Sequence, residues 1–312
     1  MIVRHGDTVE FITVLIPIFF IFGIGFVGQK LIGFDTKPLS VMAIYLMLPF
    51  LAFQTFYAAE LTMDYVIMSL YTVGLAFCII VLIYFIAFIR GYSLKRTCSM
   101  ILASAFMNNG NYGTPLIFFA FGEAGLHYAV IIMVIQQLLM CTVGVYYAAK
   151  GSPEGGGMKK AFKEVVKVPI VYGAILGIIF QFLHIPVSGS FMEAIEMVGN
   201  ASIPTIMIIL GMQLANISAK KIEIAPLSLS LSLRLLLSPV IAYVITLFLP
   251  IDDLLKQIMI VLSAMPTAAN TTMYALQYDT EPQFVSTATL FSTVLSLVTL
   301  PVVLYVSGVL YG

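Results

Sequence analysis

The amino-acid sequence predicts an all-α polytopic membrane protein. Of its 312 residues 61% are apolar, and it holds only 15 basic and 15 acidic residues. Soluble domains carry about 25% charged residues, so this chain has too few to cover a water-facing surface. Its apolar residues occur in runs that suit transmembrane helices, which need about 20 residues each. The zero net charge and the lack of a large basic block argue against nucleic-acid binding.

Charged or turn-rich breaks divide the chain into ten predicted spans. The first five lie near residues 10–30, 38–57, 65–90, 97–121 and 124–149. The second five lie near residues 165–184, 190–216, 222–249, 254–277 and 281–310. Between the two sets lies a Gly-rich, charged linker at residues 150–164, which we expect to be solvated on the cytoplasmic side.

The basic residues predict the orientation of the chain in a cell membrane, plasma or inner. Twelve of the 15 lysines and arginines lie in connections that follow odd-numbered spans. Arg4 and Lys256 lie on the other side, and Arg234 lies within the eighth span. Because Lys and Arg are enriched in cytoplasmic connections, both termini are expected outside.

An internal duplication is indicated by a shift of 159 residues. This shift aligns Ser104 with Ser263 and Asn111 with Asn270. A unit of five spans that is repeated must insert its second copy upside down, so the ten spans are expected to form two inverted five-helix repeats. Such repeats build secondary transporters, with the substrate site near the bilayer midplane.

Polar residues and prolines predict that the fourth and ninth spans are broken helices that cross. The candidate substrate-binding residues of these spans are Asn108, Asn109, Asn111, Pro115, Pro266, Thr267, Asn270 and Thr271. Non-helical backbone is tolerated at membrane depth only where protein or a wet cavity surrounds it. The freed amides of half-helix N-termini favour an anion. The alternative is that the prolines only kink the helices and that Asn and Thr bond neighbouring helices.

Other polar residues within the spans are further candidates. Gln54 and Gln136 could bind substrate or join two helices, and both interpretations stay open. Arg234 could meet a carboxylate substrate, pair with an acidic residue or extend toward the cytoplasmic surface. Glu193 and Glu196, one helical turn apart, are candidates for proton coupling, with a solvated turn as the alternative.

Cofactors, metals and catalysis are not expected. The three cysteines show no metal-ligand spacing, and the three histidines do not pair at ligand spacing. An intramembrane protease needs a catalytic Asp pair, a Ser/His pair or a metal motif. The sequence has no zinc-protease motif, and its Gly23-Ile24-Gly25 is followed by Phe26 rather than Asp, which disfavours an intramembrane enzyme. A channel or a sensor is a further alternative to a carrier.

Three segments together resemble the auxin efflux carrier family, with its bacterial branch as the nearer likeness. They are Asn108–Pro115, Ile203–Leu214 and Ala264–Asn270. The resemblance covers essentially all ten spans. It implies the fold of bile-acid sodium symporters and sodium/proton antiporters, in which broken helices four and nine cross. It also implies that the substrate is a small organic anion such as malate, malonate or an auxin-like acid.

The resemblance further implies two domains with different roles. Residues 65–149 and 217–312 would form a transport domain that moves like an elevator. Residues 1–64 and 165–216 would form a scaffold, in contact with membrane lipid, through which two copies form a homodimer. The long central loop and the acidic/basic cluster of the plant carriers are not recognisable here. Coupling is therefore open, and a sodium-coupled bile-acid-type symporter is the alternative within the same class.

Overall fold

The computed structural model describes residues 8–58, 62–153, 169–215 and 223–311, with side chains described from residue 16 onward. All regular elements in these ranges are helices, so the fold class is all-α, as the sequence predicts. Residues 154–164 of the predicted linker lie outside the described ranges. So do Arg4 and six of the twelve basic residues assigned to the cytoplasmic side.

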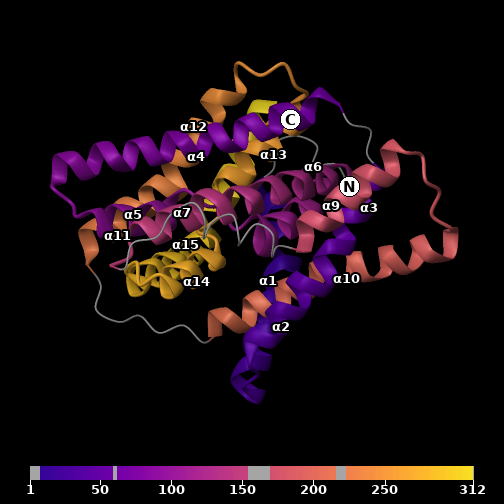
Figure 1. The fold of residues 1–312 in the computed structure, drawn as a ribbon, viewed down its shortest axis with the longest axis horizontal. Helices are drawn as coiled ribbons and strands as arrows, with labels where there is room; N and C mark the ends of the chain where they lie inside the picture. The colour runs from indigo at the N-terminus through magenta and orange to yellow at the C-terminus, as the bar shows by residue number, and fades with distance from the viewer. Residues whose placement is uncertain (1–7, 59–61, 154–168, 216–222, 312) are drawn as a thin grey trace. The chain divides into compact units, whose positions relative to one another are not determined.

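The helices follow one another as labelled in Figure 1. The first half contains α1 (Thr8–Ile32), α2 (Thr36–Met42), α3 (Leu48–Ala58), α4 (Met63–Arg90), α5 (Leu94–Ser104), α6 (Thr114–Leu139) and α7 (Val145–Lys150). The second half contains α9 (Pro169–Phe182), α10 (Gly189–Ala215), α11 (Ile224–Ser232), α12 (Ser238–Thr246), α13 (Asp253–Ser263), α14 (Ala269–Gln277) and α15 (Pro282–Tyr311). Four π-helical turns adjoin them, at Ala43–Met47, Asn109–Gly113, Met140–Gly144 and Leu233–Leu237.

Six helical segments of the described chain are long and apolar enough to cross a membrane. They are Thr36–Ala58, Met63–Arg90, Asn109–Lys150, Gly189–Ala215, Ile224–Thr246 and Pro282–Tyr311. Shorter apolar helices lie at Ile16–Ile32 and Pro169–Phe182. The long segment Asn109–Lys150 turns at Gly122, which has a φ of 68° that glycine adopts without strain. It therefore contains the end of the predicted fourth span and all of the fifth.

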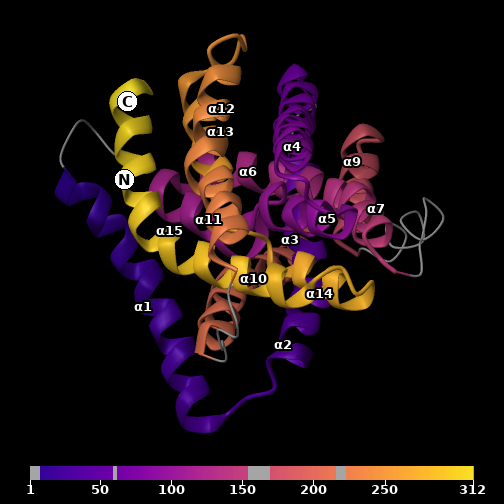
Figure 2. The same cartoon turned by 90° about the vertical axis from the view of Figure 1, so that its left-hand side faces the viewer.

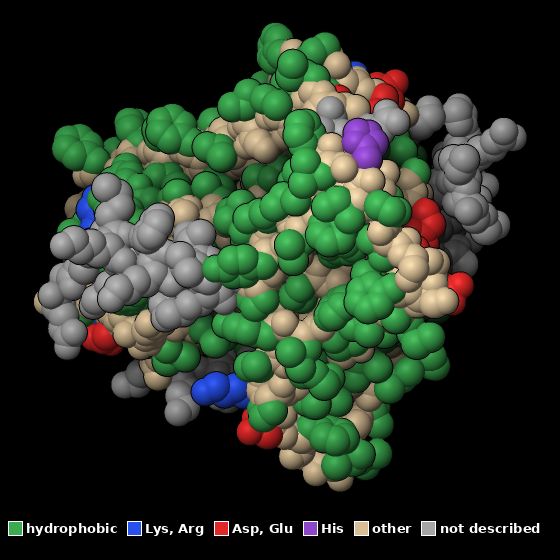
Figure 3. Space-filling view, turned by 45° about the vertical axis from the view of Figure 1, so that its right-hand side comes forward, with side chains coloured by type: hydrophobic (Ala, Val, Ile, Leu, Met, Phe, Trp, Pro, Cys, Tyr) green, Lys and Arg blue, Asp and Glu red, His purple; other side chains and the backbone are tan. Residues whose placement is uncertain are grey.

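Large apolar side chains are exposed along the apolar helices and at their ends. Phe88 is 87% exposed, Phe248 is 82% exposed and Leu31 is 79% exposed. Figure 3 shows hydrophobic side chains spread across the face in view, with charged side chains only in small groups. Exposed apolar area of this kind suits contact with lipid tails rather than with water.

The chain divides into two compact units. The first comprises the described parts of residues 1–66, 110–134 and 168–217. The second comprises the described parts of residues 67–109, 135–167 and 218–312. The two units differ in what packs their helices together, and each is described by itself.

Glycines allow very close helix contacts in the first unit, where α1 packs on α10 and α3 packs on α9. A Cβ atom added at Gly25 would lie 2.0 Å from the backbone oxygen of Ile208, and one at Gly211 would lie 2.0 Å from that of Phe22. A Cβ at Gly173 would lie 2.1 Å from the backbone oxygen of Pro49. Small residues at such crossings let two backbones approach and gain van der Waals contact where lipid gives no hydrophobic driving force.

The second unit is built around two short helices, α5 and α13. Each has 11 residues, and their bounds are 159 residues apart at both ends. Each is capped at its start by a side chain, since Ser93 accepts a hydrogen bond from the Arg96 amide and Asp252 accepts one from the Leu255 amide. α12 lies alongside α13 (Figure 2), and α15 contacts α5, α13 and α14.

Replacing Gly25 with alanine tests the close contact between α1 and α10. The added methyl group clashes with the backbone at Ile208. We therefore expect the free energy of unfolding to fall by about 1–3 kcal/mol or more, as overpacking usually costs. Thermal unfolding of the purified protein in detergent measures this loss. Gly28→Ala is the matched control, because a Cβ there meets nothing within 4 Å. Equal melting temperatures for the two variants would contradict the close contact.

Candidate substrate site at the crossing of two helix breaks

Both predicted helix breaks are present, and they meet within the second unit. α5 ends at Ser104 and helical structure resumes at Asn109, while α13 ends at Ser263 and α14 begins at Ala269. Between these ends, Met107 and Thr267 form an isolated antiparallel bridge. The amide of Asn108 donates to the Pro266 carbonyl at 2.9 Å, and the amide of Ala268 donates to the Phe106 carbonyl at 3.0 Å. The unwound backbones thus satisfy one another, as buried backbone polar groups must.

Thr267 connects this crossing to two neighbouring helices. Its hydroxyl donates to the Ala103 carbonyl on α5 at 2.5 Å. Its amide donates to the hydroxyl of Ser292 on α15 at 3.1 Å. The side chain is completely buried, so these bonds have no competition from solvent. The geometry gives Thr267 a structural part in holding the crossing.

Arg234 is directed at the C-terminal ends of both short helices. It is 1% exposed, and its guanidinium donates to the carbonyl of Ser104, the last residue of α5, at 2.9 Å. It also donates to the carbonyl of Ser263, the last residue of α13, and to the hydroxyl of Ser238 at 2.5 Å. The sequence left three interpretations of Arg234 open. Because its bonds are to carbonyls and a hydroxyl and its side chain is buried, it neither pairs with an acidic residue nor extends to the surface.

The other candidates of the second unit lie at or near the breaks. Asn108 and Asn109 are buried, at 5% and 1% exposure, and the Asn109 amide group lies 3.9 Å from the Met107 sulfur. Asn270 is half-buried in the first turn of α14, and no side chain caps the start of that helix. The Thr271 hydroxyl donates back to the Ala268 carbonyl at 2.8 Å.

Gln136 differs from these residues in its surroundings. It is 3% exposed, yet neither its amide nitrogen nor its amide oxygen has a hydrogen-bond partner among the described residues. A buried amide without a partner costs about 1–3 kcal/mol, so it is a place where a bound polar group would be favourable.

The remaining candidates belong to the first unit. Asn111 is half-buried and Pro115 is buried in the first turn of α6. The Gln54 amide group donates to the side-chain oxygen of Asn200 on α10 at 2.7 Å, as the interpretation of a bond between helices predicts. Glu193 and Glu196 are exposed on α10.

Sequence reasoning missed several serines that complete the crossing. Ser104 and Ser263 supply the carbonyls that accept from Arg234. The Ser238 hydroxyl accepts from Arg234 and donates to the Ser263 carbonyl. The Ser292 hydroxyl accepts from the Thr267 amide. The one sequence signal was the alignment of Ser104 with Ser263 under the shift of 159 residues. Within the described ranges, no three His, Cys, Asp or Glu side chains gather as metal ligands would.

Comparison with known proteins assigns the chain to a family. A family model described as membrane transport protein matches residues 10–304. The chain belongs to this family, that of the auxin efflux carriers. The family predicted from the three sequence segments is thereby confirmed. With its six long apolar helices, the protein is a multi-pass membrane transporter.

Two of three relatives of this auxin efflux carrier family member cover nearly its whole length. A protein of Methanothermobacter thermautotrophicus named as an uncharacterized transporter is 28% identical over 298 residues, which is 95% of this chain and 96% of the relative. A protein of Rhizobium meliloti named "Putative malonate transporter" is 25% identical over 312 residues, which is 95% of each chain. An uncharacterized transporter of Methanocaldococcus jannaschii is 26% identical over 208 residues, which is 65% of this chain and 66% of that one.

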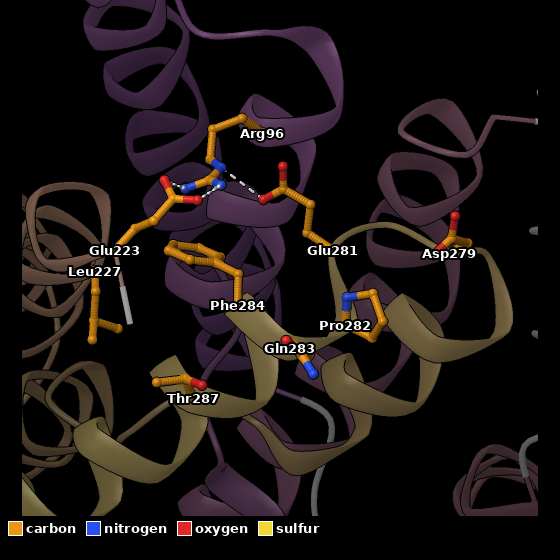
Figure 4. A pocket seen from close by; sticks show the side chains of 9 residues that line it. All are labelled: Arg96, Glu223, Leu227, Asp279, Glu281, Pro282, Gln283, Phe284 and Thr287. Carbon is orange, nitrogen blue, oxygen red and sulfur yellow. Dashed lines mark hydrogen bonds and ion pairs between the residues drawn. The ribbon is translucent and has the colours of Figure 1, made fainter. Parts of the chain in front are cut away.

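The transporter also has an ionic cavity of about 410 Å³ where α5, α11 and α15 begin (Figure 4). Arg96 lies between Glu223, at 2.9 Å from two guanidinium nitrogens, and Glu281, at 2.6 Å from Nε. Burial alone would lower the pKa of Arg96, but the two carboxylates raise it above its ordinary value. The Arg96 guanidinium in turn holds the pKa of Glu223 below its ordinary value. These pairs join the starts of three helices.

Thr267→Val tests the bond between the crossing and α5. Valine has nearly the same shape but cannot donate to the Ala103 carbonyl, so we expect stability to fall by about 1–3 kcal/mol. Melting temperature in detergent is the measurement. Thr142→Val serves as the control, because Thr142 is exposed and bonds only carbonyls of its own helical segment. An unchanged melting temperature for Thr267→Val would show that the bond contributes nothing.

Glu223→Gln tests the ionic cavity through its pH dependence. Because the folded pKa of Glu223 is lowered, its ion pair adds stability above the pKa of the unfolded state, about 4.5, and this is lost as the pH falls through the folded pKa. We expect Glu223→Gln to melt below the unmodified protein at pH 7 by a small margin, since Glu223 is 68% exposed. The margin should close at acid pH and in high salt. Glu123→Gln, another exposed glutamate, is the control.

Proposed function

We propose that the protein is a secondary transporter that carries a small organic anion, a carboxylate such as malonate, malate or an auxin-like acid, across the membrane by elevator-type alternating access. The observation that carries this proposal is the crossing of the two helix breaks at Met107 and Thr267. Each break is followed by a new helix start, whose partial positive charge favours a negatively charged group. Asn108, Asn109, Asn270 and Gln136 supply amide groups for the carboxylate.

The proposal includes ten spans arranged as two inverted repeats. Its support is the equal length of α5 and α13, their common offset of 159 residues and the side-chain caps at the equivalent positions Ser93 and Asp252. In the first unit, the contacts of the first span with the seventh and of the second with the sixth are those that an inverted duplication would relate.

The proposed transport domain contains residues 65–149 and 217–312, and the proposed scaffold contains residues 1–64 and 165–216. Support comes from the two compact units, which follow this division except at residues 110–134. We place the protein in the plasma or inner membrane with both termini outside and two copies joined through the scaffold. Support for the orientation is the concentration of basic residues in the connections after odd-numbered spans.

Malonate is the first substrate to test, because one relative that spans the same length is named for it. The buried positions of the described chain include no acidic residue, which disfavours an intramembrane sodium site. Sodium-coupled symport is the alternative, and flux with and without a sodium gradient separates the two mechanisms.

Uptake of labelled malonate, malate and indole acetate into proteoliposomes tests the proposal. We expect a saturable flux of at least one of these acids. Asn270→Ala should lower kcat/KM by about tenfold or more, because a hydrogen bond from a side-chain amide to a carboxylate is worth about 1.5–3 kcal/mol. Gln277→Ala, which removes an exposed amide from the other end of α14, should leave the flux unchanged.

Three outcomes would contradict parts of the proposal. Full flux in Asn270→Ala would exclude the assigned site. Binding without flux would indicate a sensor. Conductance far above the turnover of a carrier would indicate a channel.

A further inference from the structure

Arg234 is the one charged side chain among the buried residues that the structure describes. We infer that Arg234 is a positioning residue that binds the C-terminal ends of both short helices, α5 and α13. By balancing the partial negative charge of these ends, it makes the affinity of the crossing depend on the number of negative charges on the substrate. The inference concerns the site of the proposed function and rests on it for the part about substrate charge.

The first step is electrostatic. The last carbonyls of a helix lack intrahelical partners and carry a partial charge of about −0.5. Two helix ends, at Ser104 and Ser263, therefore present about one negative charge, which the single charge of Arg234 balances. This explains how an arginine can be 1% exposed with no acidic side chain bonded to it.

The second step is geometric. Arginine presents five N–H donors in a planar fork, so one side chain can bind two carbonyls in a fixed arrangement. Ser238 strengthens this arrangement, because its hydroxyl accepts from Arg234 and donates to the Ser263 carbonyl at 2.9 Å. The paired backbones of Phe106 and Ala268 follow within a few residues of these helix ends. Arg234 thus fixes the positions from which the two chain segments enter the crossing.

The third step concerns the other side of the breaks. The helices that follow the breaks begin at Asn109 and Ala269, and their first turns carry partial positive charge. Among the buried described residues there is no carboxylate to offset this charge. Since Arg234 cancels the negative ends, the positive ends act on the substrate without an opposing field. Affinity should therefore rise with each carboxylate that the substrate carries.

Two readouts test the inference on the full-length protein, in Arg234→Gln, Arg234→Lys and Ser238→Ala. The first readout is hydrogen exchange of the backbone at residues 105–109 and 264–269, where the amides of Asn108 and Ala268 form the crossing. It needs no substrate. We expect exchange to accelerate about tenfold or more in Arg234→Gln, and about threefold in Ser238→Ala and Arg234→Lys. The rate should rise with the number of hydrogen bonds that each variant loses, because these bonds oppose local opening of the backbone.

The second readout is inhibition of malonate uptake by malonate, by malonamate and by malonamide, which carry two, one and no carboxylates. In the unmodified protein, the inhibition constants should rise in that order. In Arg234→Gln, the ratio of the constants for malonamide and malonate should shrink by about tenfold or more, whereas Arg234→Lys should keep most of it. A purely structural loss would weaken all three ligands equally and leave the ratio unchanged. Lys256→Gln is the control, because Lys256 is a half-buried lysine of α13 that bonds Asp253 in the same helix.

The outcomes separate this inference from the proposed function. Unchanged exchange in Arg234→Gln would overturn the positioning role, and an unchanged ratio would overturn the electrostatic role. If Arg234→Gln does not yield folded protein, Ser238→Ala decides the positioning role by its exchange. A ratio that shrinks about tenfold in Arg234→Lys, which keeps the positive charge, would then overturn the electrostatic role. If the unmodified protein does not move malonate, the malonate proposal fails, while the exchange measurement still decides whether Arg234 positions the crossing.

Discussion

The need to satisfy backbone polar groups where two helices are interrupted determines much of this structure. Lipid offers no hydrogen bonds, so each free N–H or C=O in the hydrocarbon region costs several kcal/mol unless protein supplies a partner. At the crossing, the unwound chains bond each other between Phe106 and Ala268 and between Asn108 and Pro266. Proline suits this place, because it has no N–H to satisfy while its carbonyl still accepts. The crossing of the two breaks depends on these bonds.

The two compact units solve their packing by different means. In the first unit, glycines such as Gly25 and Gly211 let backbones touch, and side chains such as Gln54 and Asn200 bond to each other. In the second unit, side chains bond the backbone of neighbouring helices, as Tyr71 does to the Met259 carbonyl at 2.8 Å and Thr280 to the Ala148 carbonyl at 2.5 Å. Polar bonding of this kind accompanies the interrupted helices, which expose more backbone than continuous ones.

The ion pairs and the buried charge of the described chain lie in different places. The ion pairs of the described chain, such as Arg96 with Glu223 and Glu281, lie at helix starts, where water and salt screen them. In the buried interior, Arg234 faces backbone carbonyls and a hydroxyl. Under the proposed function this separation would favour binding of an anion, because a buried carboxylate near the crossing would repel it.

The amino-acid sequence by itself determined the helical fold class, the approximate limits of the apolar segments and the positions of the two breaks. These follow from local composition, because apolar runs favour helices in lipid and clusters such as 107–115 cannot continue one. The same clusters predicted most of the polar residues near the crossing. The family could also be predicted, since two of its three segments coincide with those breaks.

Only the tertiary structure decided which groups those residues bond. Arg234 reaches carbonyls 130 and 29 residues away, and the Gln54 amide finds Asn200, 146 residues away, instead of remaining free. Gln136 gives no sign in the sequence that its buried amide lacks a partner, while the neighbouring Gln137 amide bonds the Cys141 sulfur. The physical reason is that a hydrogen bond depends on distance and direction in space, which local composition does not specify.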